Sequence, residues 1–134
     1  MRLEITQRAD LAVRALVVLS ESATRLKSKD LASELCTTPG IVPQAVGPLV
    51  RAGWVRSVPG PGGGYESVTP LEELNVCQVV EEIDGPTDSG RCVVADRMCD
   101  AGAPCALHAS WIRARDELLS SLAATSMASI TVSC

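Results

Sequence analysis

The sequence predicts a mostly α-helical chain with a small β wing, arranged as a winged helix-turn-helix and followed by a long C-terminal helix. One observation is the order of its early segments: helix, short helix, turn, helix, then a glycine-tipped hairpin. The other is an apolar stripe near the C-terminus, whose members recur at spacings of four, three, four and four residues. The order of the segments, rather than any one of them, indicates the fold.

The first two helices are predicted from apolar spacing and capping residues. Residues 7–22 carry leucine and alanine at helical spacing, and Thr6 before them is a suitable N-cap. Ser28 is expected to cap a short second helix over residues 29–35. The break at residues 36–38 then forms the turn of a helix-turn-helix.

The third helix is expected to run over residues 39–52. Thr38 followed by Pro39 is a strong start signal, because a capping hydroxyl precedes a proline at the first helical position. Gly53 is a natural residue for the position after the helix ends. Pro48 should remove one intrahelical hydrogen bond and kink the helix.

The wing is predicted as two short strands, residues 54–58 and 65–68, joined by the turn of residues 59–64, which is rich in proline and glycine. Asn75 can cap a fourth helix that ends near residue 84. A last helix is expected over residues 105–122, followed by a short turn capped by Thr125 or Ser126. Its apolar stripe consists of Leu107, Trp111, Ala114, Leu118 and Leu122.

These elements divide the chain into three parts. Residues 1–85 are expected to form the winged helix-turn-helix, residues 86–104 an irregular cysteine-rich loop, and residues 105–134 a dimerisation helix with a C-terminal tail. The chain is short, with 134 residues and almost no aromatic side chains, so its core must be built from Leu, Val, Ile and Ala. Burial of the long helix against a second copy would add to that small core.

Composition narrows the function classes. The formal net charge of −4 is not that of a protein that coats nucleic acid non-specifically, although it allows a local basic face. No secretory signal and no apolar run of roughly 20 residues is visible, so no membrane association is expected and the cytoplasm is the expected compartment. With one histidine and no nucleophile–base motif, an enzyme is not expected.

Three cysteines and a histidine lie close together in sequence. Cys92, Cys99 and Cys105 are separated by six and five residues, and His108 follows three residues after the last of them. Thiolates suit iron–sulfur clusters or zinc. A site of three cysteines and one histidine is a normal structural zinc site, but zinc cysteines usually form tighter pairs. The spacing therefore favours an iron–sulfur cluster and keeps zinc as the alternative.

A second group of residues is expected to face double-stranded DNA. A recognition helix offers its N-terminal residues to base edges, while a wing contacts the backbone or minor groove. Three glycines at the tip of the wing would let backbone N–H groups approach phosphates. The candidates are Thr37, Thr38, Gly40, Gln44, Arg51, Arg56, Gly62, Gly63, Gly64 and Tyr65.

Four segments resemble the family of iron–sulfur winged-helix regulators that includes the IscR, NsrR and RirA types. They are MRLEITQRADLAVRAL, LVRAGWVRSVPGPGGGY, VVEEIDG and RCVVADRMCDAGAPCALHASW, and together they span nearly the whole chain. The chain departs from the family pattern at Pro43, where many relatives carry a polar or basic residue. It also has one more residue than is common between Cys92 and Cys99.

The resemblance implies a homodimeric transcription regulator that binds near-palindromic operators and responds to nitric oxide, iron supply or redox stress. It implies that Cys92, Cys99 and Cys105 hold the cluster. CALHASW resembles the IscR-type pattern, in which a histidine at the position of His108 completes a 2Fe–2S cluster. Asp10 matches the aspartate that serves a 4Fe–4S cluster in NsrR-type proteins, so the 2Fe–2S cluster is favoured and the 4Fe–4S cluster is the alternative.

Overall fold

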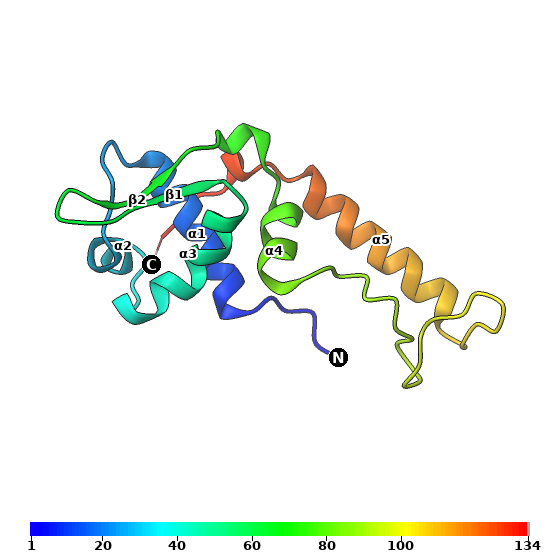
Figure 1. Cartoon of the computed structure of the whole chain (residues 1–134). Coiled ribbons are helices and arrows are strands. Elements are labelled where there is room, and N and C mark those ends of the chain that lie inside the picture. Colours follow the sequence, from blue (N-terminus) through cyan, green and yellow to red (C-terminus); the bar gives the residue numbers. More distant parts are fainter. Residues whose placement is uncertain (134) are drawn as a thin grey trace.

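The computed structural model describes residues 1–133, which form a helical body from which one long helix projects (Figure 1). The body holds four α-helices and a two-stranded hairpin, and the fifth helix leads away from it to the cysteine-rich loop. In chain order the elements are α1 Gln7–Glu21, α2 Ser28–Glu34, η1 Pro39–Ile41, α3 Val42–Arg51, β1 Val55–Val58, β2 Gly64–Ser67, η2 Leu71–Glu73, α4 Val76–Asp84, α5 His108–Ala124 and η3 Met127–Ser129. This is the predicted winged helix-turn-helix with a long C-terminal helix.

Helix α1 forms the centre of the body, and α3 and α4 pack against it. Its buried face is made of leucine, valine and alanine, and it begins where the Thr6 hydroxyl accepts a hydrogen bond from the Ala9 N–H, as predicted. No aromatic side chain is fully buried in the described part of the chain, which confirms the expectation from composition. The largest fully buried side chains are Leu11, Leu16, Leu31, Leu35, Leu49, Met127, Val17, Val42, Val46 and Val79.

The helix-turn-helix differs from the prediction in how its helices begin. Ser28 is the first residue of α2 rather than its cap, and the cap position, Lys27, makes no side-chain hydrogen bond. The third helix starts with the single 3₁₀ turn η1, so α3 begins at Val42, and Thr38 makes no capping hydrogen bond. Helix α3 continues without a break through Pro48 and is followed by Gly53, whose φ is +83°.

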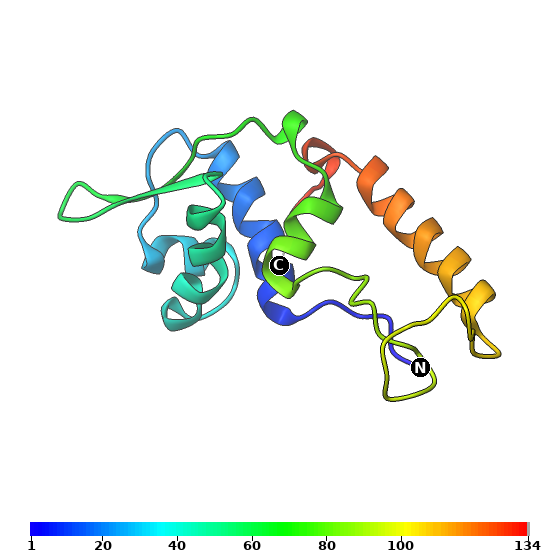
Figure 2. The same cartoon turned by 45° about the vertical axis from the view of Figure 1, so that its right-hand side comes forward.

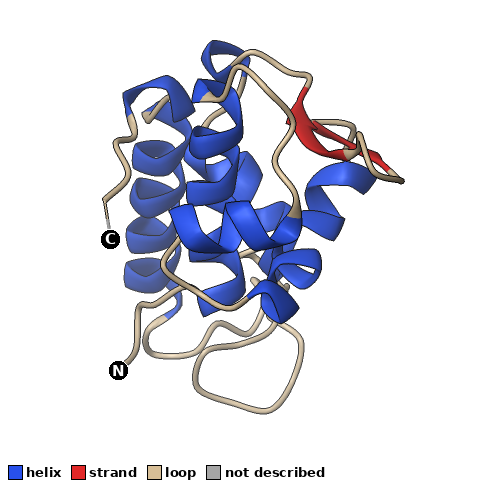
Figure 3. Cartoon of the chain, turned by 90° about the vertical axis from the view of Figure 1, so that its left-hand side faces the viewer, coloured by secondary structure: helices blue, strands red, loops and turns tan. Residues whose placement is uncertain are grey.

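The wing is an antiparallel hairpin in which Arg56 pairs with Glu66 and Val58 with Gly64. It is attached to the body by a bridge between Leu26 and Tyr65, whose backbone groups exchange two hydrogen bonds of 3.0 and 2.8 Å. In Figure 3 the hairpin lies at one edge of the helices and the long loop at another.

The start of α4 and the end of α5 are linked by a backbone hydrogen bond. Asn75 caps α4 with a reciprocal capping box, as predicted, and the Val76 N–H donates to the Thr125 carbonyl oxygen at 3.0 Å. Ser126 caps η3, which places Met127 in the core with no exposed surface. The C-terminal tail therefore packs with the winged body.

Helix α5 begins at His108, three residues later than predicted. Cys105 lies in a turn closed by the hydrogen bond from the His108 N–H to its carbonyl oxygen, at 3.2 Å. Leu107 takes the N-cap position without a side-chain hydrogen bond, so no capping side chain fixes this start.

No residue of α5 is buried in the single chain. One face, turned toward the loop and α4, is half-buried, while Leu107 and Leu118 of the predicted stripe are 49% and 40% exposed. Among residues 1–133, no helix combines the length and the apolar character needed to cross a bilayer.

Candidate metal centre and nucleic-acid interface

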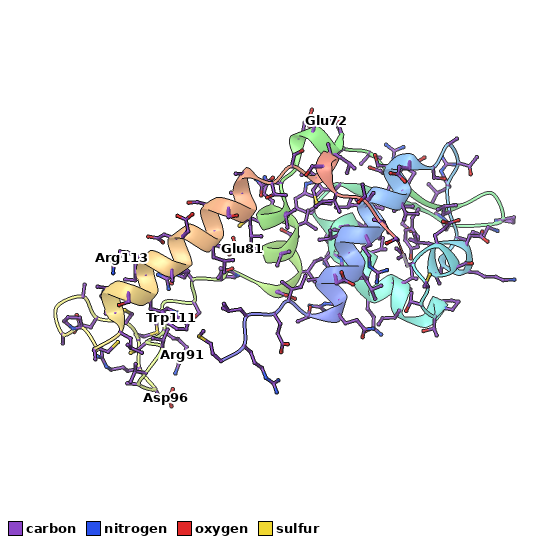
Figure 4. The ribbon with its side chains drawn as sticks, turned by 180° about the vertical axis from the view of Figure 1, so that it is seen from behind. Glu72, Glu81, Arg91, Asp96, Trp111 and Arg113 are labelled. Carbon is purple, nitrogen blue, oxygen red and sulfur yellow. The ribbon has the colours of Figure 1, made fainter. Side chains whose placement is uncertain are left out.

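The three clustered cysteines and His108 line one small cavity at the N-terminal end of α5. It has a volume of about 20 Å³, the size of a single water molecule. Helix α5 supplies one wall because His108, Trp111, Ile112 and Arg115 recur at helical spacing, and the loop supplies the other. Figure 4 shows Trp111 and Arg91 on the loop side of α5, with Arg113 on the opposite side.

The four candidate ligands form two contacts. The Sγ of Cys99 lies 3.2 Å from the Nδ1 of His108. Cys92 is hydrogen-bonded to Cys105 and also accepts from the Ala95 N–H at 3.4 Å. The fold thus brings the three cysteines of the loop and His108 of α5 together.

The surroundings of Cys92 favour its thiolate form. Backbone N–H groups, first of Ala95 and then of Val94, lower the pKa of Cys92 below its ordinary value. Burial opposes this lowering less strongly than the two N–H groups favour it, and the Cys105 side chain and the Arg97 charge add smaller effects that lower the pKa further. A lowered thiol pKa is what a metal ligand or a reactive thiol requires.

The loop is held by its own polar contacts rather than by a core. The Arg97 guanidinium donates to the carbonyl oxygens of Met98 and Ala103, at 3.3 and 3.0 Å. Arg91 forms an ion pair with Asp96. Because most side chains of residues 93–104 are exposed, the loop can change shape at little cost in buried surface.

These residues fit a thiolate-bound metal group by their chemistry and their place. Within residues 1–133, however, no three His, Cys, Asp or Glu side chains are positioned to hold a metal ion. The cavity is also smaller than a multi-atom cluster. A bound group therefore requires the exposed Cys99 side of the loop to move outward, which its few packing contacts allow.

Asp10, the alternative fourth ligand, does not line this cavity. It lies on α1, half-exposed, and its carboxylate pairs with Arg14 four residues later, at 3.1 Å. Cys77, on α4, also lies outside the cavity: it is half-buried and contacts Glu81 at 3.4 Å. Burial, followed by the Glu81 carboxylate, raises the pKa of the Cys77 thiol.

The second candidate surface lies at the other end of the molecule, over η1, α3 and the wing (Figure 1). Thr38, Gly40, Gln44 and Arg51 are exposed there, and Thr37 is half-buried. Pro43 is exposed among them and has no side-chain donor. The exposed face of the third helix is therefore polar but carries a single cation near its end.

An ion-pair network occupies the base of the wing. The Glu66 carboxylate accepts from Arg56 Nη1 at 3.0 Å and from Arg25 Nε at 3.3 Å. Because one carboxylate faces both guanidinium groups, the positive charge that Arg56 offers to a phosphate is reduced. The sequence prediction named Arg56 and missed Glu66, which is its cross-strand partner in the observed register.

Two of the wing glycines are required by internal packing. A Cβ on Gly63 would lie 1.9 Å from the Val58 carbonyl oxygen, and one on Gly64 would lie 2.8 Å from the Leu26 carbonyl oxygen. Gly64 also has a φ of +135°. Only Gly62 of the three has open space where a Cβ would lie.

A basic segment at the start of α2 was not singled out by the sequence prediction. Arg25, Lys27 and Lys29 alternate along the chain, and Leu26 between them bridges to the wing at Tyr65. Lys27 and Lys29 are exposed, and no ion pair is recorded for either within residues 1–133. The alternation was the signal, and it adds two cations to the wing side of the molecule.

Comparison with known proteins agrees with this architecture. A family model described as Rrf2, iron-dependent transcriptional regulator, matches residues 5–133. A protein of Mycobacterium tuberculosis named as an HTH-type transcriptional regulator is 32% identical over 96% of this chain and 81% of its own. The HTH-type transcriptional regulator IscR of Escherichia coli is 29% identical over 87% of this chain and 72% of its own.

Solved structures share the fold along almost the whole chain. The oxidised form of CymR from Staphylococcus aureus is 25% identical, with a TM-score of 0.72 over 98% of this chain and all of that one. The IscR of T. potens has a TM-score of 0.70 at 16% identity, which shows a common fold. These proteins are DNA-binding transcriptional regulators rather than enzymes, and the chain belongs to the Rrf2 family of winged-helix transcriptional regulators.

Proposed function

We propose that the chain is a DNA-binding regulator whose operator affinity is controlled by an iron–sulfur cluster held by Cys92, Cys99, Cys105 and His108. The observation that carries the proposal is that these four donors, which come from the loop and from the start of α5, line one cavity at the N-terminal end of that helix. The iron-dependent description of the family and the likeness to IscR support the same function.

A bound cluster would supply a group sensitive to oxidation, nitric oxide and iron supply. His108 contacts Cys99 through its Nδ1, which supports it as the fourth ligand, and the IscR-type pattern with a histidine at this position favours a 2Fe–2S cluster. A 4Fe–4S cluster that takes Asp10 is the alternative. Since Asp10 lies outside the cavity of its own chain, it would have to come from a second copy.

The coupling to DNA rests on the chain's own contacts. Ligation orders residues 86–107, and Asp88 in this segment pairs with Arg115 on α5 at 3.2 Å. The loop thereby fixes the N-terminal half of α5, whose other end is tied to α4 through Thr125. A shift of α5 relative to α4 changes the position of its exposed apolar face.

We propose a homodimer formed through that face. Residues 1–85 bind DNA, residues 86–104 form the cluster loop, and residues 105–134 form the dimerisation helix and tail. In a dimer the angle between the two α5 helices sets the distance between the two recognition helices. Half-sites one turn apart, about 34–36 Å, are then matched in one cluster state and mismatched in the other.

On the DNA side, we propose that Gln44 reads base edges and that Thr37, Thr38 and Arg51 contact the backbone. Gln pairs with adenine, and hydroxyl and guanidinium groups reach phosphates. The backbone of Gly40 and Gly62 and the Arg56 side chain complete this surface. We expect the regulator to act in the cytoplasm, with its operator.

The competing function is that of a winged-helix DNA-binding protein with a structural zinc ion at the same four residues and no sensory role. Three thiolates and one imidazole form a normal structural zinc site. Zinc would order the loop permanently, because it has no redox chemistry. The two functions therefore differ in whether DNA affinity changes when the bound group is oxidised.

DNA affinity measured with and without the bound group tests the proposal. Fluorescence anisotropy on one operator duplex should show a difference of about 5–150-fold between cluster-loaded and cluster-free protein, as is typical of allosteric coupling. Cys99→Ser should remove the difference, and Cys77→Ser, outside the cavity, should keep it. Equal affinity of the two wild-type forms would contradict the switch.

A further inference from the structure

Arg115 on α5 lines the cysteine cavity and carries an unpaired polar atom. Among the buried side-chain nitrogen and oxygen atoms of residues 1–133, the Nε of Arg115 alone has no hydrogen-bond partner. The side chain is 19% exposed. Since a buried N–H without an acceptor is unfavourable, such an atom indicates a missing partner.

The rest of the guanidinium is held in place. Its Nη1 donates to the Asp88 carboxylate at 3.2 Å, which ties the side chain to the loop. Arg115 also lines the cavity that Cys92, Cys99 and Cys105 surround, two turns after His108 on the same face of α5. Arg115 and the cysteines thus line one small cavity.

The other guanidinium groups nearby are already engaged. Arg91 lines the same cavity, but its side chain is 54% exposed and paired with Asp96. Arg97 donates to two loop carbonyl groups. Arg115 therefore differs from both in combining low exposure, a fixed position and a donor without an acceptor.

We propose that Arg115 is the electrostatic partner of the group bound at the cysteines: it donates its Nε–H to a sulfur atom there, and Asp88 positions it. This deepens the cluster proposal and rests on it. A guanidinium is charged at all relevant pH values, and a hydrogen bond to sulfur favours the reduced, more negative state of a cluster. Arg115 should therefore raise the reduction potential, acting as a positioning and tuning residue rather than as a ligand.

The test compares Arg115→Met, Arg115→Lys and Arg113→Met with the wild type. Arg113 is an exposed arginine on the opposite side of the same helix, so it is a matched control (Figure 4). Each protein is purified without oxygen, and iron, sulfide and reduction potential are measured. At a fixed potential, Arg115→Met should lower the reduced-to-oxidised ratio about tenfold, which equals about 59 mV for one electron. Arg115→Lys should give a smaller shift, and Arg113→Met none.

A second variant covers the case in which Arg115→Met cannot hold the cluster. Arg115→Gln removes the charge but keeps a polar side chain, and it should shift the potential in the same direction. Unchanged potentials in Arg115→Met, or in Arg115→Gln where the first is colourless, would overturn the role of Arg115 while leaving the cluster proposal intact. Wild-type protein without iron and sulfide would overturn both, and the two failures are thus distinguishable.

Discussion

Replacing Gly64 by alanine tests whether the wing glycines serve internal packing or contact with DNA. Gly64 has a φ of +135°, which residues with a Cβ rarely adopt. An alanine Cβ would lie 2.8 Å from the Leu26 carbonyl oxygen and 2.9 Å from its carbon. Both are backbone atoms and cannot move independently, so the wing must shift away from the body.

The cost follows from the backbone strain and from the bridge that is lost. An unfavourable φ costs about 1–3 kcal/mol. The two hydrogen bonds between Leu26 and Tyr65, at 3.0 and 2.8 Å, contribute about 1 kcal/mol each if they are broken. Gly64→Ala should therefore lower the free energy of unfolding by about 3–5 kcal/mol when both bonds are lost.

Gly62→Ala is the matched control, because a Cβ at Gly62 meets no atom within 4 Å. Urea unfolding followed by circular dichroism, at one protein concentration, measures both variants. Gly62→Ala should change stability by less than about 0.5 kcal/mol, and any effect it has should be on DNA affinity. Equal stability of the two variants would refute the packing argument.

Three further predictions concern charge and protonation. In reduced, metal-free protein near pH 7.5, iodoacetamide should modify Cys92 before Cys77, because the pKa of Cys92 is lowered and that of Cys77 is raised. Mass spectrometry measures the ratio of the two rates, which should fall as the pH rises and Cys77 also ionises. Equal rates at pH 7.5 would be inconsistent with this prediction. Glu66→Gln should free Arg56 and strengthen DNA binding at low salt, with a slope of log affinity against log salt steeper by about 0.9 for each added phosphate contact; an unchanged slope would show that the freed charge does not reach DNA. His108→Ala should remove the acid sensitivity of cluster retention that wild type is expected to show, since protons compete for a ligating imidazole; the same loss of 400 nm absorbance with falling pH in both proteins would rule His108 out as a ligand.

The parts of the fold that depend on local signals could be predicted from the sequence. Thr6 and Asn75 accept the capping hydrogen bonds expected of them, and Ser126, one of the two residues expected to cap the final turn, caps η3. A cap involves residues within one turn, and neighbouring chain segments have little influence on it. The hairpin and its glycine-rich turn were predictable for the same reason.

Helix starts without a local cap were placed wrongly. Ser28 lies inside α2, and the third helix opens with a 3₁₀ turn although Thr38 precedes Pro39. The last helix begins at His108 rather than Cys105 because the preceding loop closes into turns of its own. In each case the contacts of the surrounding chain decide the boundary, and these are not visible in a local pattern.

The candidate site divides in the same way. The four donors were evident from residue type and spacing, whereas Arg115 was not, because its environment arises only when Asp88 in the loop meets α5. Met127 shows the same limit, since a residue near the end of the chain becomes part of the core. Long-range packing creates both environments.

The central claim, that the four clustered donors hold an iron–sulfur cluster, is tested most directly by one measurement on protein purified without oxygen. It is the absorption spectrum, with iron, acid-labile sulfide and zinc assayed in the same sample. The account predicts brown protein that absorbs near 400 nm, with iron and sulfide in equal amounts of about two each per chain for the favoured cluster. Colourless protein that contains about one zinc per chain would contradict it and make the site a structural staple.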